Sequence, residues 1–542
     1  MGGSCKPSCS WLEWATRQSS TPGRVSESFV LAMTRMGKCD VCRQRKVKCD
    51  ERHPQCGQCM KKNRPCQYEY GKVPKFVSGQ PKLADGAFRM PADDSSDFSE
   101  DSSTAEQSWN ENARPNAFDD SLRARFIEVM GPKPMQWNSS FLWGTWIALV
   151  PARLGKNSAL DAATACFIAG SIAHRSKSEA NIAAARKQYS KALLSLQNVL
   201  TGMDQDLRLS SETLAAVKFL LVFETFLGMR TNRWVSHSRG LTDLLVARGP
   251  EADADDMNRS LFYASLPHEF TEALLNGVDS AFDSPTWIYF PPPDYPTECP
   301  AFTIAYQVIM QQMVRIPRLT RLAREVRSDP YNIDLGMEAL ALAEKLYLSD
   351  LGTIVDGVVN SYSEWFPTLD EGLARYYPDS IEFSSLSVFE TLIRYCFCRI
   401  LILGLCRVLK EVVPFSPILD SASLAYEELR NASLIATSMQ YAEKQKNPFP
   451  LGALLGILPL QVAFGTWWRV QRGDIDENTA EVDRSWEKER ASFMKEWCRE
   501  KSNGMLRIWN GHEKSTSRLE VQIAALEGGP LMEWMKRRIT PL

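Results

Sequence analysis

The sequence predicts a mainly α-helical protein in which a small cysteine-rich module is followed by a disordered linker and a large all-α domain. Three observations predict this fold. Six of the 14 cysteines lie close together near the N-terminus, and an acidic, serine-rich stretch follows them. From about residue 119 onward, apolar residues recur at helical spacing, and no series of alternating strands is found.

The charges are distributed unevenly along the chain. The 542 residues carry a net charge of only -2, and 44% of them are hydrophobic, which is typical of a globular protein. Residues 38–66, however, hold nine basic and three acidic residues, a net charge of +6, whereas residues 67–542 carry -10. A small basic head therefore precedes a large, mildly acidic body.

Two segments are predicted to be disordered. Residues 1–36 show no periodicity, so we expect them to form an N-terminal tail. They also lack an apolar core of the signal-peptide type, which favours a protein of a reducing compartment. Residues 71–118 contain four prolines and an acidic, serine-rich run from Asp93 to Glu106. Such a segment buries too little apolar surface to offset its chain entropy. We therefore expect a solvated linker in preference to a phosphorylated or activating segment.

The body, residues 119–542, shows several helical patterns. One apolar face is formed by Ile182, Tyr189, Leu193, Leu196 and Leu200. Ser210 or Ser211 can cap a helix that runs to Gly228, and another helix is expected to stop at Gly249 and Pro250. Further helices are expected near 335–349, 385–411, 420–444 and 481–500. Residues 290–300 are proline-rich and predict a rigid connector between helical lobes.

One uncharged stretch, residues 448–468, has the length of a transmembrane helix. It contains three prolines and three glycines, and Gln461 would lie inside the hydrocarbon layer. The flanking charges give no orientation bias. The sequence therefore predicts a buried core helix and no membrane partner.

The clustered cysteines have the spacing C-x2-C-x6-C-x6-C-x2-C-x6-C. They are Cys39, Cys42, Cys49, Cys56, Cys59 and Cys66. Zinc takes four soft ligands in a tetrahedron, so six thiolates suffice for two ions if two of them bridge both metals. Iron–sulfur clusters typically use tighter spacing, and disulfides are disfavoured in a reducing compartment. The spacing predicts two Zn²⁺ per chain.

The segment CDVCRQRKVKCDERHPQCGQCMKKNRPCQYEY, within residues 37–70, resembles the DNA-binding domain of fungal binuclear zinc-cluster transcription factors. The resemblance implies that Cys39 and Cys56 bridge the two metals. It also implies a short helix that starts near Asp40 and whose end enters the major groove of DNA. Pro54 matches the proline that turns the chain between the two halves of the module.

The same resemblance assigns the DNA contacts. Lys46 occupies the position that reads bases, commonly in a CGG-type triplet. The resemblance then implies that Arg43, Arg45 and Lys48 bind DNA phosphates. Basic donors suit the O6 and N7 acceptors of guanine, and further cations release counterions from the DNA backbone. The basic run RQRKVK would also serve as a nuclear-import signal.

The body resembles the fungal-specific regulatory domain of the same proteins. The similar segments are LDAATACFIAGSIAHR, YSKALLSLQNVL and RWVSHSRGLTDLLVARGP, the last with a W-x2-H-x2-G spacing. No functional residue is carried over from this resemblance. His237 is expected to be a packing residue, and Cys396 and Cys398 are expected to lie in the core.

The sequence thus predicts a sequence-specific, zinc-dependent regulator of RNA polymerase II genes and not an enzyme. We expect it to act in the nucleus, where it would bind double-stranded DNA and co-regulators. Two alternatives use the zinc module as a targeting device, for a helical enzyme or for a regulator acting through protein contacts. An enzyme would use Asp253, Asp255 and Asp256 as a metal site, but no second group completes it. Residues 67–92 are too rich in glycine and proline for a coiled coil. Binding as a monomer and a homodimer through the helical domain both stay open.

Overall fold

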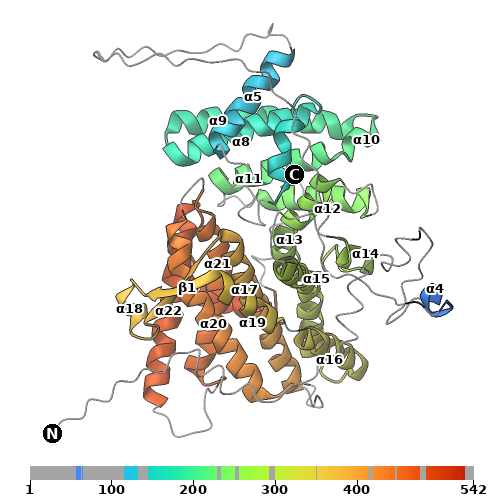
Figure 1. Cartoon of the computed structure of the whole chain (residues 1–542). Coiled ribbons are helices and arrows are strands. Elements are labelled where there is room, and N and C mark those ends of the chain that lie inside the picture. The colour runs from blue at the N-terminus through green and yellow to red at the C-terminus, as the bar shows by residue number, and fades with distance from the viewer. Residues whose placement is uncertain are drawn as a thin grey trace, which may run out of the picture. The chain divides into compact units, whose positions relative to one another are not determined.

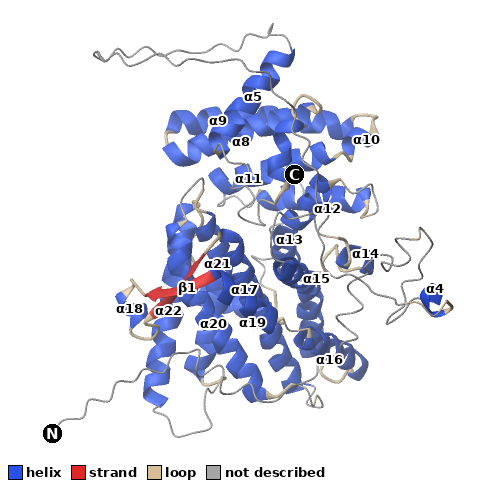
Figure 2. Cartoon of the chain, in the orientation of Figure 1, coloured by secondary structure: helices blue, strands red, loops and turns tan. Residues whose placement is uncertain are grey.

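The computed structural model describes one part of the cysteine-rich segment and most of the body. The described residues are 45, 57–62, 64, 115–131, 144–228, 233–250, 255–291, 300–349, 351–412, 416, 419–445, 449–475 and 484–531. The chain divides into two compact units, Met1–Glu106 and Gln107–Leu542. The described part of the second unit is almost entirely helical, as Figure 2 shows.

The first unit contributes one described element, the single-turn helix α4 (Gly57–Met60). Lys61 and Lys62 continue it as a turn.

The second unit begins with a group of helices that pack on one another (Figure 1). They are α5 (Pro115–Met130), α7 (Trp146–Leu149), the 3-10 helix η1 (Val150–Ala152), α8 (Ser158–Ser176), α9 (Glu179–Thr201), α10 (Gln205–Arg208), α11 (Ser211–Gly228) and α12 (Trp234–Arg248). Phe126, Phe167 and Phe219 bring α5, α8 and α11 together, with ring centroids 4.9 to 6.0 Å apart.

The remaining helices of the second unit include a long central helix, α19. They are α13 (Asp256–Asn276), α14 (Pro285–Ile288), α15 (Pro300–Ser328), α16 (Ile333–Leu348), α17 (Gly352–Tyr362), α18 (Glu371–Ala374), α19 (Leu386–Val412), α20 (Ser421–Lys444), α21 (Leu451–Arg472), α22 (Arg484–Ile508) and α23 (Thr516–Leu526). Helix α19 contacts α15, α16, α17, α20 and α21. It is mostly apolar and buried on nearly all sides, as expected of a central helix, and its buried charged residues Glu390, Arg394 and Arg399 are held in ion pairs.

The described residues include one β-hairpin. Strands β1 (Ser363–Pro367) and β2 (Asp379–Phe383) pair antiparallel, with Ser363 opposite Phe383. The hairpin was not predicted, because β1 is short and largely exposed and therefore shows no alternation of buried and exposed side chains.

Local capping explains where the predicted helices begin and end. The hydroxyl of Ser210 accepts a hydrogen bond from the backbone N–H of Thr213 at 3.2 Å, which confirms a capped start for α11. Gly249 ends α12 with φ 82°, a conformation that favours glycine. The helices expected near 335–349, 385–411, 420–444 and 481–500 are confirmed as α16, α19, α20 and α22.

Two expectations need correction. Helix α5 begins at Pro115, so the predicted linker, residues 71–118, extends four residues too far. Proline is well suited to the first turn of a helix because its φ is already helical and its missing N–H would have no partner there. On α9 the predicted apolar face is only partly buried: Leu193 is 37% exposed, and the tightest packing is made by the smaller Ala185 and Ala192.

The uncharged stretch forms α21 and is confirmed as a core helix. It is the one helix among the described residues that is long and apolar enough to cross a membrane, and 78% of its most apolar 18-residue window is buried inside the protein. Gln461 is only 2% exposed.

A buried ionic network joins the C-terminal helices. Glu428 of α20 is fully buried and accepts a hydrogen bond from Arg407 of α19 at 2.7 Å. Arg469 of α21 contacts both Glu428 and Glu527, which follows α23. The hydroxyl of Thr466 donates a hydrogen bond to the Glu428 carboxylate at 3.0 Å. Because this carboxylate is paired from two sides, its charge is compensated in the core.

Candidate metal and nucleic-acid site

Helix α4 carries the one expected zinc ligand that the structure describes, Cys59. The cysteine is 2% exposed, whereas Met60, Lys61 and Lys62 are exposed. The backbone carbonyl of Cys59 accepts hydrogen bonds from the N–H groups of Lys62 at 3.2 Å and Arg64 at 3.0 Å. The turn thus directs the thiol inward and the neighbouring lysines toward solvent.

This arrangement fits a zinc ligand. A module of about 30 residues has too little apolar surface to bury a side chain by packing alone, so an inward thiol in a basic segment suits a metal-held fold. The other five expected ligands, Cys39, Cys42, Cys49, Cys56 and Cys66, lie outside the described residues. Among the residues that the structure describes, no group of three or more His, Cys, Asp or Glu side chains is suited to hold a metal.

Of the four expected DNA contacts, the structure describes Arg45, which is exposed and lies in a turn. Arg43, Lys46 and Lys48 lie outside the described residues, as does the helix expected near Asp40. The exposed Lys61 and Lys62 add two cations to the described surface of the head.

The aspartates considered for an enzyme site have structural roles where they are described. Asp255 caps α13 by accepting a hydrogen bond from the N–H of Asn258 at 2.9 Å, and it pairs with Arg153 at 3.0 Å. Burial by itself would raise the pKa of Asp255, but these two partners lower it overall. Asp256 pairs with Arg259, and Asp253 lies outside the described residues.

His237 is confirmed as a packing residue of α12. Its Nε2 lies 2.8 Å from the hydroxyl of Tyr189 on α9, and the Tyr189 ring stacks on Phe223 of α11 with centroids 4.7 Å apart. Burial lowers the pKa of His237 to about 4, so its imidazole is neutral at physiological pH.

The two cysteines expected in the core are confirmed there. Cys396 and Cys398 of α19 are fully buried. Burial raises the pKa of both thiols, which keeps them protonated and poorly reactive.

Sequence analysis missed the buried polar groups of the body. Lys218 of α11 has no exposed surface, and its Nζ donates to the carbonyl of Ala264 at 2.7 Å. Gln461 and Lys514 meet at the edge of a pocket. For Lys218 the available signal was a single lysine inside the apolar run LAAVKFLLVF, because such a residue is carried into the core with its helix. Gln461 was already expected in a core helix, and Lys514 lies in a polar loop that carries no such signal.

Comparison with known proteins agrees with this geometry. Residues 38–72 match the fungal Zn(2)-Cys(6) binuclear cluster domain, and residues 146–351 match the fungal specific transcription factor domain. An uncharacterized protein of Emericella nidulans is 23% identical over 227 residues, which are 41% of this chain and 47% of that protein. The chain therefore spans about half the length of this curated relative. No solved structure matches the chain.

The two matches coincide with the two sequence resemblances. The first contains all six clustered cysteines and the basic run between them. The second extends from the start of α7 to the residue before α17, and it includes the W-x2-H-x2-G segment of α12. The chain thus carries a segment that matches the fungal Zn(2)-Cys(6) binuclear cluster domain, followed by a segment that matches the fungal specific transcription factor domain.

Proposed function

We propose that this chain is a sequence-specific regulator of RNA polymerase II genes that acts in the nucleus and reads CGG-type triplets through residues 37–70. The observation that carries the proposal is the six-cysteine spacing with its basic run, at the place where the binuclear cluster domain matches. The net charge of +6 in residues 38–66 favours DNA, whereas the -10 of residues 67–542 disfavours further contact with the phosphates.

We propose that the head holds two zinc ions through six thiolates, with Cys39 and Cys56 as the shared ligands. Bound zinc cross-links the thiolates and supplies folding energy that a module of this size lacks. The inward thiol of Cys59 supports this arrangement. The surrounding lysines and arginines lower the cost of gathering thiolates, because positive charge favours thiolate over thiol.

The basic side chains divide into two roles in this proposal. Lys46 donates to guanine acceptors in the major groove and so selects the sequence. Arg43, Arg45 and Lys48 bind phosphates, which strengthens binding to every sequence alike. The exposed position of Arg45 is consistent with a phosphate contact.

The body is proposed to control where and when the head acts, without catalysis of its own. Of the three aspartates considered for an enzyme site, the two that the structure describes, Asp255 and Asp256, serve as a helix cap and in ion pairs. Co-regulators and a second copy of the chain are its proposed partners. Monomeric binding to a single half-site is the other option, because the glycine- and proline-rich residues 67–92 disfavour a coiled coil.

The test is a comparison of Lys46→Ala with Arg43→Ala in the zinc-loaded full chain. On duplexes with and without a CGG triplet, Lys46→Ala should lose about 1–3 kcal/mol of discrimination. Arg43→Ala should weaken binding to both duplexes by the same factor and reduce the salt dependence. Lys187→Ala, at an exposed site on α9, is the control and should bind normally. Equal losses on both duplexes for both head variants would contradict the assignment.

A further inference from the structure

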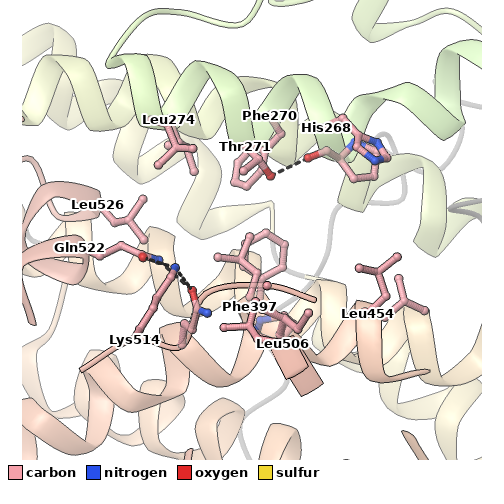
Figure 3. Close-up of a pocket in the computed structure, with 18 of the residues that line it drawn as sticks. His268, Phe270, Thr271, Leu274, Phe397, Leu454, Leu506, Lys514, Gln522 and Leu526 are labelled. Atoms are coloured by element: carbon pink, nitrogen blue, oxygen red, sulfur yellow. Dashed lines mark hydrogen bonds between the residues drawn. The ribbon is translucent and has the colours of Figure 1, made fainter. Parts of the chain in front are cut away.

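A pocket of about 320 Å³ lies within the second unit, between α13 on one side and α19, α21 and the α22–α23 region on the other. Figure 3 shows His268, Phe270, Thr271 and Leu274 of α13 facing Phe397, Leu454, Leu506, Lys514, Gln522 and Leu526. Its size is at the lower end of the range of small-molecule sites.

Most of the pocket wall is apolar. Phe270 and Leu274 come from α13, Phe397 comes from α19, and Leu454 comes from α21. Leu506 at the end of α22 adds to this surface. Because such a wall offers few hydrogen-bonding partners, it favours a ligand with a hydrocarbon or aromatic body.

One part of the pocket is polar. The Nζ of Lys514 donates to Gln461 Oε1 at 2.8 Å and to Gln522 Oε1 at 2.5 Å, and Gln522 Nε2 donates to Gln461 Oε1 at 3.0 Å. Since a lysine can only donate, the oxygen of Gln461 must face Lys514, which fixes the orientation of this amide. The Nε2 of Gln461 is then a buried donor without a hydrogen-bond acceptor.

The charged side chains that line the pocket are cationic. Arg394, Lys514 and Arg518 line it, and no Asp or Glu does so among the residues that the structure describes. Arg394 is held from behind by Glu390, with Nε and Oε1 2.8 Å apart. A cationic lining with an unsatisfied amide donor favours a ligand that accepts hydrogen bonds and carries negative charge.

We propose that this pocket binds a small, mainly apolar carboxylate. Its carboxylate would accept hydrogen bonds from Lys514 and Gln461 Nε2, and its apolar body would lie along the wall formed by Phe270 and Phe397, whose rings contact each other edge to face with centroids 5.5 Å apart. The walls come from segments that lie some 200 residues apart in the sequence. A bound carboxylate therefore stabilises the packing of α13 against the C-terminal helices, and it raises the thermal stability of the chain.

Decanoate is a suitable probe, with decanol and decylamine as matched comparators of the same length. Titration calorimetry on the zinc-loaded full chain should show saturable binding of one decanoate, at least tenfold tighter than decanol, and no binding of the decylammonium ion. Lys514→Met should weaken decanoate binding about tenfold or more and leave decanol unaffected. Leu274→Trp should block both ligands by filling the pocket.

Two controls keep the outcome interpretable. Lys187→Met, far from the pocket lining, should bind decanoate normally, and each variant should unfold cooperatively and keep its DNA binding. Absence of decanoate binding, equal binding of decanol and decanoate, or decanoate binding that is unchanged in both Lys514→Met and Leu274→Trp would overturn the proposal. The titration contains no DNA, so its failure is distinct from a failure of the DNA-binding proposal.

Discussion

The buried Lys218 predicts a stability that depends on pH. Its Nζ lies 3.4 Å from Nδ1 of His268 on α13, and its side chain has no exposed surface. Burial, and then the nearby positive charge of Arg394 on α19, lower the pKa of Lys218 from 10.5 to about 7. Burial is also the main cause of the strongly lowered pKa of His268, so the imidazole adds no positive charge at neutral pH.

The sign and size of the effect follow from proton linkage. Between pH 7 and 10.5 the unfolded chain keeps the lysine proton while the folded chain releases it. The free energy of unfolding therefore rises with pH across this interval, at most by about 1.4 kcal/mol per pH unit. Because the folded lysine is half protonated at pH 7, the expected gain from pH 7 to pH 9 is about 2 kcal/mol.

Urea unfolding of the full chain at pH 7, 8 and 9 measures this gain. Lys218→Met removes the titrating group, so its free energy of unfolding should lack the rise of about 2 kcal/mol that Lys218 gives the wild-type chain. Lys187→Met, at an exposed site, should show the wild-type dependence. The comparison between variants cancels the other titrating groups. Parallel profiles for the wild type and Lys218→Met would refute the reasoning.

Four further substitutions test the packing of the body and the zinc site of the head. Glu428→Gln should destabilise the body by about 3–5 kcal/mol in urea, because it removes the carboxylate that pairs with Arg407 and leaves Arg469 with Glu527 alone; a change below 1 kcal/mol would contradict this. Gly452→Ala should cost about 1–3 kcal/mol in urea, since the added Cβ would lie 2.6 Å from the carbonyl oxygen of Ala442. Gly240→Ala, with nothing within 4 Å of the added Cβ, should stabilise α12 by about 0.5–1 kcal/mol, and equal effects of the two glycine substitutions would argue against the close approach. Cys59→Ser should lower the zinc content measured by elemental analysis and abolish DNA binding; an unchanged zinc content would exclude this ligand.

Local signals were sufficient to predict many helices. The glycine after Arg248 stops α12 because it adopts a positive φ, and a hydroxyl at Ser210 marks the start of α11. The spacing of the six cysteines was sufficient to predict the domain, because metal geometry restricts which separations can supply common ligands. The apolar stretch with Gln461 was correctly predicted as a core helix, since an amide and several prolines and glycines are poorly suited to lipid.

Features made by distant segments could not be predicted. The hairpin of β1 and β2 depends on pairing, and β1 alone has no pattern that distinguishes it from a loop. The pocket forms only when α13 approaches α21 and α23, and no local periodicity encodes that approach. The exposure of Leu193 has the same origin, because the neighbours of α9 determine which side of its broad apolar face is covered.

The central claim is that a zinc-held head reads DNA sequence. The most direct measurement is selection from a pool of randomised duplexes with the full chain, before and after zinc removal by a chelator and again after zinc is restored. The account predicts enrichment of CGG-type triplets by the zinc-loaded chain, loss of that enrichment with the chelator, and recovery with two zinc ions per chain. Enrichment that persists in the zinc-free chain, or no enriched sequence with zinc bound, would contradict it.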